Sequence, residues 1–195
     1  MKLAIIASAV LVMAAPIAMA QTSAQTSTWK SDPAHSEVDF AIKHMALSNV
    51  HGRFGTVDAT LVWDEQDVTK STVSATIDVT GVDTGVPNRD TDLKSARFFD
   101  TANNPKATFT STSVTKSGSG LQMNGNLTIK GVTKPVVLDV DGPTGPLTGM
   151  NKKPHLGFSA TTTVHREDFG IGAGMPAAML GDDVKITIEL DLVKQ

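Results

Sequence analysis

The sequence predicts an all-β protein, a barrel or sandwich of about eight antiparallel strands with one or two short helices. The clearest evidence is the stretch 121–140, where apolar residues such as Met123 and Leu127 alternate with polar ones. This period of two is typical of a strand with one apolar and one polar face. The break at 131–135 makes the stretch a hairpin, since Pro135 has no amide hydrogen and suits the start of a strand. One hairpin cannot bury its apolar face alone, so other strands must close around it.

Six further segments show the same alternation. In chain order they span residues 37–43, 56–63, 72–79, 107–116, 156–164 and 185–192. Turn residues separate them, for example the run Ser117-Gly118-Ser119-Gly120 before the central hairpin, and the Gly- and Pro-rich segment 141–154 predicts a long loop. Eight short strands with turns between them favour a sandwich or a barrel.

Two segments have helical rather than strand character. Residues 88–99 carry Leu93 and Phe99 at helical spacing, so we expect a short helix there with Asn88 as its N-cap. A second helical turn is expected at 45–50.

Residues 1–20 have the pattern of a secretory signal peptide, with cleavage expected after Ala20. Lys2 supplies a positive charge, residues 3–17 form an uncharged apolar run, and Ala18-Met19-Ala20 is a small-x-small site. The run is short for a membrane span and has no basic stop-transfer flank. We therefore expect an exported protein whose mature chain begins with a polar, disordered segment at 21–28.

The remaining residues, 29–195, have the length and composition of one mildly acidic domain. The chain has no cysteine, so no disulfide can stabilise it. A net charge of −3 without a basic cluster argues against nucleic acid or anionic lipid headgroups as main partners. No second apolar run reaches membrane-spanning length. An outer-membrane barrel is disfavoured, because a chain with no Tyr and 5% aromatic residues cannot supply two aromatic girdles.

Three histidines, His35, His44 and His51, are candidate metal ligands or catalytic groups because they lie close together in the sequence. Their spacing is not that of a tight metal motif. Asp32, His35 and Ser36 have the residue types of a catalytic triad, but sequence neighbours rarely converge as one and no Gly-x-Ser-x-Gly elbow is present. A metal- or histidine-dependent enzyme stays open as an alternative, and it predicts that the three imidazoles converge on one cavity.

Arginines that flank the expected helix or lie beside phenylalanines are candidates for binding a phosphate at the mouth of a barrel, through a bidentate guanidinium contact. They are Arg53, Arg89, Arg97 and Arg166. Each could instead pair with a carboxylate such as Asp90 or Asp168. We expect these ion pairs rather than phosphate binding, because surface ion pairs are common.

The alternation also predicts which side chains point into the lumen, because the apolar residues of each strand share one face. On the strands we expect Phe40, Ile42, Leu61, Ile77, Phe109, Met123, Leu127, Leu138, Phe158 and Ile188. Residues 170–183 read as an irregular segment, and we expect Phe169, Met175 and Met179 to form a lid there. Small residues share the inward faces, namely Ala59, Ala75, Ala107, Gly125, Ala160 and Thr162. The lumen could therefore hold one apolar ligand or be filled by its aromatic residues, and composition leaves both open.

Several sequence blocks resemble the YceI-like family, and together they cover nearly all of the expected mature chain. The blocks are Asp32-x-x-His35-Ser36-x-Val38-x-Phe40, His44, Gly52-x-Phe54, Arg89-Asp90-x-x-Leu93-x-Ser95-x-x-Phe98-Phe99, Pro105-x-Ala107-Thr108-Phe109, Gly125-x-Leu127-Thr128-Ile129-x-Gly131-Val132-Thr133-Lys134-Pro135-Val136, Arg166-x-Asp168-Phe169-Gly170 and Asp183-Val184-x-Ile186-x-Ile188.

This resemblance implies a lipocalin-like antiparallel β-barrel in the periplasm. It implies a binding or carrier protein that holds a polyisoprenoid lipid, either an isoprenoid quinone or a polyprenyl phosphate, non-covalently in the lumen. It implies no cofactor, no metal and no catalytic residue set, while a homodimer stays open. A third interpretation, a ligand-free stress-response protein, predicts a lumen packed solid, with no connected cavity of a few hundred Å³.

Overall fold

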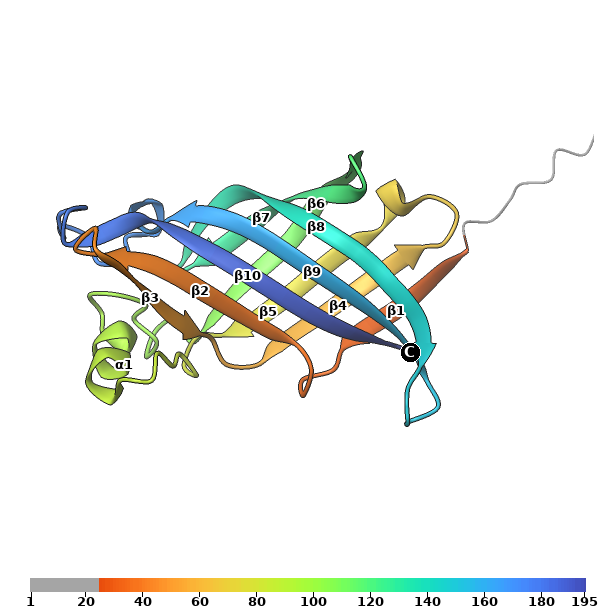
Figure 1. Cartoon of the computed structure of the whole chain (residues 1–195), viewed down its shortest axis with the longest axis horizontal. Coiled ribbons are helices and arrows are strands. Elements are labelled where there is room, and N and C mark those ends of the chain that lie inside the picture. Colours follow the sequence, from red (N-terminus) through yellow and green to blue (C-terminus); the bar gives the residue numbers. More distant parts are fainter. Residues whose placement is uncertain (1–24) are drawn as a thin grey trace, which may run out of the picture.

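The structure is a computed structural model that describes residues 25–195, and in that range it contains ten β-strands and one α-helix (Figure 1). The strands are β1 (Thr26–Ser31), β2 (Glu37–His44), β3 (Ser48–Arg53), β4 (Val57–Asp64), β5 (Thr72–Asp78), β6 (Lys106–Ser117), β7 (Gly120–Ile129), β8 (Val132–Thr148), β9 (Pro154–His165) and β10 (Leu180–Lys194). The helices are α1 (Pro87–Lys94) and two 3₁₀ turns, η1 (Val68–Lys70) and η2 (Arg166–Phe169). The expected signal peptide lies outside the described residues.

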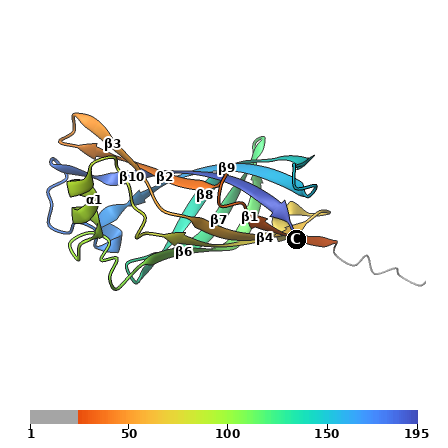
Figure 2. The same ribbon diagram turned by 90° about the horizontal axis from the view of Figure 1, so that it is seen from below.

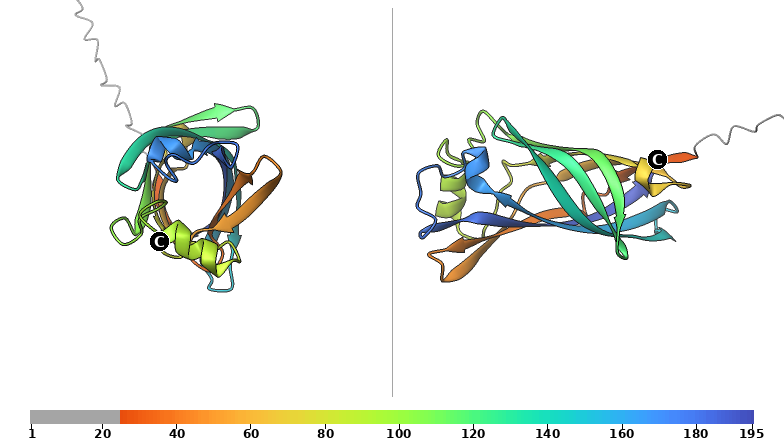
Figure 3. Two further views of the ribbon diagram at one scale, coloured as in Figure 1. Left: turned by 90° about the vertical axis from the view of Figure 1, so that its left-hand side faces the viewer. Right: turned by 90° about the horizontal axis from the view of Figure 1, so that it is seen from above.

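The antiparallel sheet closes on itself through β10. The order β1-β4-β5-β6-β7-β8-β9-β10 returns to β1, where Trp29 pairs with Lys194. The earlier part of β10 pairs with β2, so β1 and β2 share one position in the ring, interrupted by a loop at 32–36. β3 pairs with β2 and extends the sheet beyond the ring. The end-on view shows the closed ring (Figure 3). The predicted fold class, an antiparallel barrel of about eight strands, is confirmed.

The hairpin predicted at 121–140 forms β7 and the first part of β8. Met123 is paired with Leu138, so the apolar residues of the two strands lie side by side on the same face of the sheet. Lys130 and Gly131 make the turn with positive φ angles of 50° and 76°. This left-handed pair is the turn geometry that matches the twist of a two-residue hairpin.

Buried side chains occupy the inside of the barrel along its whole length. One cluster, near α1, contains Phe40, Phe98 and Phe169. A second cluster in the middle includes Phe109, and a third, at the opposite end, includes Trp29. Seen from below, α1 and the β2–β3 hairpin lie at one end of the barrel and the C-terminus lies at the other (Figure 2).

Strand β8 continues to Thr148, so most of the segment 141–154 is strand rather than the long loop that we expected. Its register against β9 shifts twice, between Asp141 and Thr144 and again between Thr144 and Leu147. Such bulges accommodate Gly and Pro, which fit poorly into a regular ladder. The composition therefore indicated a loop where the chain forms an irregular strand.

Helix α1 is shorter than the predicted segment 88–99. It starts at Pro87, because a residue without an amide hydrogen is well suited to the first helical position. Val86 occupies the N-cap position and makes no side-chain cap, so the prediction of Asn88 as the N-cap was wrong. Phe99 lies in the turn that follows the helix and is buried.

Two shorter expectations were also wrong. Residues 45–50 contain no helical turn, because Met45 and Ala46 have φ angles of 51° and 55° and connect β2 to β3, which begins at Ser48. Strand β1 begins at Thr26, so the end of the segment expected to be disordered pairs with β4.

Candidate ligand-binding cavity

The barrel encloses an apolar cavity of about 150 Å³, which we call the deep cavity. It is lined mainly by the inward residues of β4 to β10, because the period of two places every second side chain of a strand inside. Among the described residues its lining contains only two small hydroxyl side chains, Ser71 and Thr162, beside the apolar and aromatic ones. An apolar cavity of this kind stays dry and accepts apolar groups.

A second cavity of about 300 Å³, the mouth cavity, lies at the end of the barrel that carries α1. Its apolar lining includes Phe98 and Ile171 from the segments that follow α1 and η2. Unlike the deep cavity, it also has charged and imidazole side chains in its lining. These are His44, Arg89, Asp92 and Arg166.

A wall of side chains separates the two cavities. Its members line both, and they are Phe54, Phe99, Ile129, Val164 and Ile186. The ring of Phe54 packs edge-on against Phe99, with centroids 5.5 Å apart and ring planes at 84°, and lies 5.2 Å from the ring of Phe40. Because the wall consists of side chains rather than backbone, rotamer changes alone could join the two cavities.

The predicted inward residues divide between the two cavities. The deep cavity is lined by Leu61, Ile77, Phe109, Met123, Leu127, Leu138, Phe158 and Ile188. The mouth cavity is lined by Phe40, Ile42, Phe169 and Met175. Met179 lines neither cavity and is 48% exposed, so its assignment to a lid was wrong. It belongs to a tight turn in which its N–H donates to the carbonyl of Pro176 at 2.8 Å.

Sequence periodicity missed three aromatic residues of the wall and the mouth cavity. Phe54, Phe98 and Phe99 lie outside the strands, where alternation carries no information. A different signal was available for them, because all three stand in the blocks that resemble a known family.

Close approach of glycine to phenylalanine shapes the interior of the barrel. A Cβ atom on Gly125 would lie 2.3 Å from the ring of Phe109, and a Cβ on Gly52 would lie 2.4 Å from the ring of Phe40. Any larger residue would push these rings into the cavities. Glycine at both positions therefore allows the rings to pack directly against the backbone.

Arg166 holds the irregular segment that covers the mouth cavity. Its side chain is 1% exposed, and its guanidinium donates to Glu167 Oε1 and to a set of backbone carbonyls at 2.9–3.1 Å. The carbonyls belong to Ile171, Gly172, Met175, Leu180 and Gly181. These bonds use the five N–H donors of the guanidinium, so Arg166 supports the cavity wall and does not offer a phosphate site.

The other three arginines differ in their surroundings. Arg53 pairs with Asp83 at 3.5 Å, as expected for a surface arginine, and Arg97 lies over the ring of Phe98. Arg89 lines the mouth cavity and donates to the side chain and the carbonyl of Thr84. Among the described residues no carboxylate lies within 4.0 Å of Arg89, so the expected ion pair is missing there.

The model of the YceI-like domain matches residues 29–192 of this chain. The chain belongs to the YceI-like family. It is 39% identical over 159 residues to protein YceI of Escherichia coli O17:K52:H18, a match that covers 80% of this chain and 81% of that protein.

Solved structures share the barrel of this YceI-like protein. BcnA of Burkholderia cenocepacia has a TM-score of 0.74 at 25% identity, covering 83% of this chain and 98% of BcnA. A polyisoprenoid binding domain from Saccharophagus degradans, implicated in plant cell wall breakdown, has a TM-score of 0.63 at 15% identity, covering 88% and 100%. At this low identity the second likeness concerns the fold.

The three histidines singled out in the YceI-like sequence do not converge. His44 lines the mouth cavity, His51 is exposed on β3, and His35 lies in the loop between β1 and β2, beside a shallow surface groove. The prediction that these imidazoles meet in one cavity was wrong. The order of β2 and β3 keeps His44 and His51 in the hairpin near the mouth, whereas His35 precedes β2 at its other end.

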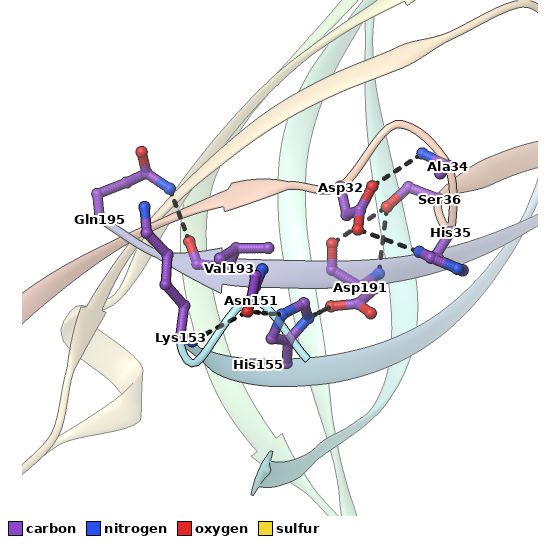
Figure 4. Close-up of polar contacts among 10 residues, drawn as sticks. All are labelled: Asp32, Ala34, His35, Ser36, Asn151, Lys153, His155, Asp191, Val193 and Gln195. Carbon is purple, nitrogen blue, oxygen red and sulfur yellow. Dashed lines mark hydrogen bonds and ion pairs between the residues drawn. The ribbon is translucent and has the colours of Figure 1, made fainter. Parts of the chain in front are cut away.

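Figure 4 shows the polar cluster around His35. His35 Nδ1 lies 3.0 Å from Asp32 Oδ2, and His155 Nδ1 lies 2.6 Å from Asp191 Oδ1. A hydrogen bond from the backbone N–H of Ala34 and a second one from His35 hold the pKa of the Asp32 carboxyl below its ordinary value. The same carboxylate raises the pKa of His35.

Two sets of side chains bring potential metal-ligand atoms within 4.8 Å of one another in the described part of the chain. One is Asp32, His35 and Asp191, and the other is His165, Asp182 and Asp183. In both sets the imidazole already contacts a carboxylate, at 3.0–3.3 Å. Across residues 25–195, no helix has the length and apolar character needed to cross a membrane.

Proposed function

We propose that this YceI-like protein is a periplasmic carrier that sequesters an isoprenoid lipid, a quinone or a polyprenyl phosphate, in its lumen. The observation that carries the proposal is the deep cavity, whose lining is almost entirely aliphatic and aromatic. Burying each CH₂ group of a prenyl chain there contributes about 0.8 kcal/mol, and water offers no comparable environment for it. The polyisoprenoid binding domain that shares the fold supports the same class of ligand.

The difference between the two cavities sets the orientation of the bound ligand. The prenyl tail occupies the deep cavity, and the headgroup lies in the mouth cavity beside His44 and Arg89. Arg89 has no carboxylate partner among the described residues, so its guanidinium can donate to quinone oxygens or to a phosphate. The tail passes the wall between the cavities, which requires the rings of Phe54 and Phe99 to turn aside.

A ligand-free role is the second candidate, and one observation favours it. A cavity of about 150 Å³ is the size that accepts a single benzene-like molecule, so without movement of the wall the deep cavity holds only the end of a prenyl chain. Bound lipid distinguishes the two functions, since only the carrier retains an isoprenoid through purification.

The decisive experiment is native mass spectrometry of protein purified without detergent, followed by solvent extraction and lipid analysis. The empty protein is then offered a quinone and, separately, a polyprenyl phosphate. A retained isoprenoid, or stoichiometric uptake of either lipid, supports the carrier. A preparation that is empty and takes up neither lipid contradicts it.

A matched pair of variants tests whether the lipid enters the lumen. Met123 points into the deep cavity and is 9% exposed, whereas its neighbour Asn124 donates a hydrogen bond to Ser113 on the outer face of the barrel. Met123→Glu is expected to reduce uptake severely, because an unpaired carboxylate in an apolar lumen costs several kcal/mol or must be protonated. Asn124→Glu is expected to leave uptake unchanged.

A further inference from the structure

The loop between β1 and β2 folds back onto the outer face of the barrel and is fastened to one residue of β10, Asp191 (Figure 4). The N–H of Asp32 donates to the carbonyl of Asp191 at 2.8 Å. The hydroxyl of Ser36 donates to the same carbonyl and accepts from the N–H of Asp191, both at 3.2 Å. Within the loop, the N–H of Ala34 donates to Asp32 Oδ1 at 2.9 Å. These bonds fix the backbone on both sides of His35.

Asp32, His35 and Asp191, which we call the loop site, bring together the nitrogen and oxygen ligands that zinc accepts in proteins. Their ligand atoms all lie within 4.8 Å of one another, and the pair His35 Nδ1 and Asp32 Oδ2 is 3.0 Å apart. Around a tetrahedral Zn²⁺ with bonds of about 2.0–2.1 Å, neighbouring ligand atoms lie about 3.3 Å apart. Rotation of the three side chains, without a change of the backbone, is therefore enough to surround one ion.

The carboxylate of Asp191 is oriented by polar groups outside the loop site. His155 Nδ1 lies 2.6 Å from Asp191 Oδ1, and His155 Nε2 lies 3.2 Å from Asn151 Oδ1, which also accepts from the N–H of Lys153 at 2.9 Å (Figure 4). Carboxylates that bind metals are commonly held by such a hydrogen bond from a residue that is not itself a ligand. Asp191 Oδ2 makes no hydrogen bond among residues 25–195, so this second oxygen is left for an ion.

The surface beside the loop site carries carboxylates that no lysine or arginine neutralises. A groove of about 310 Å³ is lined by Asp141, Glu189 and Asp191, and Glu37 on β2 lies directly opposite Glu189 on β10. In the described part of the chain, no Lys or Arg nitrogen lies within 4.0 Å of these four carboxylates or of Asp32. Like charges opposite each other on neighbouring strands are destabilising. A cation bound beside them offsets the repulsion.

We propose that the loop site binds a divalent transition-metal ion, with Zn²⁺ as the expected one, through His35 Nδ1 and one carboxylate oxygen each of Asp32 and Asp191. The imidazole favours Zn²⁺ over Ca²⁺ and Mg²⁺, which prefer oxygen ligands. The side chain of His35 is 69% exposed, so the fourth position of the ion is open to water.

The bound ion joins the loop to β10 at the place where β1 and β2 share one position in the ring. In a chain without cysteine it supplies a cross-link that a disulfide cannot provide. The proposal does not rest on the carrier function, because the loop site lies on the outer surface and lines neither the deep cavity nor the mouth cavity.

The second set of potential ligands, His165, Asp182 and Asp183, is the matched control because it offers the same residue types. Asp183 is 74% exposed, whereas the loop-site carboxylates are 25% and 32% exposed. Asp182 accepts from the N–H of Glu167, but in the described chain no backbone N–H holds the side chain of Asp183. Ordering freely moving side chains around an ion costs more conformational entropy, so we expect this set to bind more weakly.

Isothermal titration calorimetry measures binding of Zn²⁺ to untagged protein that a chelator has freed of metal, at about pH 7.5, where most imidazoles are neutral. His35→Gln and Asp32→Asn each remove one ligand of the loop site, and His165→Gln is the control. We expect the wild type and the control to bind one Zn²⁺ per chain alike, and both loop-site variants to bind it roughly tenfold more weakly or worse. Zn²⁺ should also raise the Tm of the wild type and of the control, but not that of His35→Gln.

Three results would overturn the proposal: no binding of Zn²⁺ by the wild type, equally tight binding by both loop-site variants, or a loss in His165→Gln alone, which assigns the ion to the second set. Ca²⁺ is titrated separately. Ca²⁺ that binds as tightly as Zn²⁺ and does not depend on His35 also contradicts the site, since it indicates attraction to an acidic surface only. Circular dichroism confirms that each variant is folded, which is expected for His35→Gln because this side chain is exposed.

Discussion

Replacing Arg166 by Met is expected to lower the free energy of unfolding by about 3 kcal/mol. Met has a similar length and no charge, so the substitution removes the donors and leaves the volume largely filled. The hydrogen bonds to the carbonyls of Ile171 and Gly172 are buried, whereas those to Met175, Leu180 and Gly181 are partly buried and can be replaced by water.

The magnitude follows from these two classes of carbonyl. Each buried carbonyl left without a donor costs roughly 1–3 kcal/mol, and the partly buried ones add little. Two such carbonyls give roughly 2–6 kcal/mol, and relief from burying a guanidinium offsets part of this loss, which leaves about 3 kcal/mol. Because a domain of this size is stable by only about 5–15 kcal/mol, the loss is easy to measure.

Urea titration measures the free energy of unfolding, and hydrogen exchange shows which residues lose stability. The amides of residues 170–181 should lose protection before those of the strands, because the segment depends on one side chain. Arg166→Lys, with three donors in place of five, should lie between Met and wild type. Arg89→Met is the control, since Thr84 is the only hydrogen-bond acceptor of Arg89 among the described residues, and it should cost less than about 1 kcal/mol. A loss below about 1 kcal/mol for Arg166→Met, with unchanged exchange at 170–181, would refute the reasoning.

Three further outcomes are expected. Met123→Glu should abolish lipid uptake and Asn124→Glu should preserve it, as measured by native mass spectrometry, and the reverse would show that the strand register is wrong. Gly125→Val should lower the free energy of urea unfolding by about 1–3 kcal/mol, because the facing phenylalanine ring must move into the deep cavity. NMR titration should place the pKa of His35 above its ordinary 6.5, and Asp32→Asn should return it toward that value. A raised folded pKa means that this contribution to stability is complete below pH 6.5 and is lost as the pH rises through the folded pKa; an unchanged titration in the variant would exclude the pairing.

The lumen could be predicted from the sequence because a strand allows only two directions for a side chain. Once Met123 and Leu127 are assigned to the inner face, the alternating apolar residues of the neighbouring strands are assigned to the same face. Each of the ten strand residues predicted to point inward lines the deep cavity or the mouth cavity. Their role in binding a lipid stays a prediction.

The mouth cavity could be predicted only in part, since about half of its lining comes from α1, η2 and irregular segments. Arg166 illustrates the difficulty, because its partners are backbone carbonyls that no sequence pattern reveals. The extension of β8 was missed for a related reason. Gly and Pro at 142–146 indicate a turn in isolation, but the long neighbouring strand β9 imposes pairing on them through two bulges.

The deep cavity lowers the stability of the fold, and this loss bears on why the barrel is hollow. An unfilled cavity lowers stability by about 24 cal/mol per Å³, so 150 Å³ corresponds to about 3–4 kcal/mol relative to a packed interior. Larger side chains at Ala59, Ala75 or Ala160, all of which line the cavity, are a simple route to recover that energy. A protein whose only requirement was to fold has no reason to keep small residues there. A carrier does, because the ligand recovers the missing contacts when it binds, and the cost of the empty lumen becomes part of the affinity for the lipid.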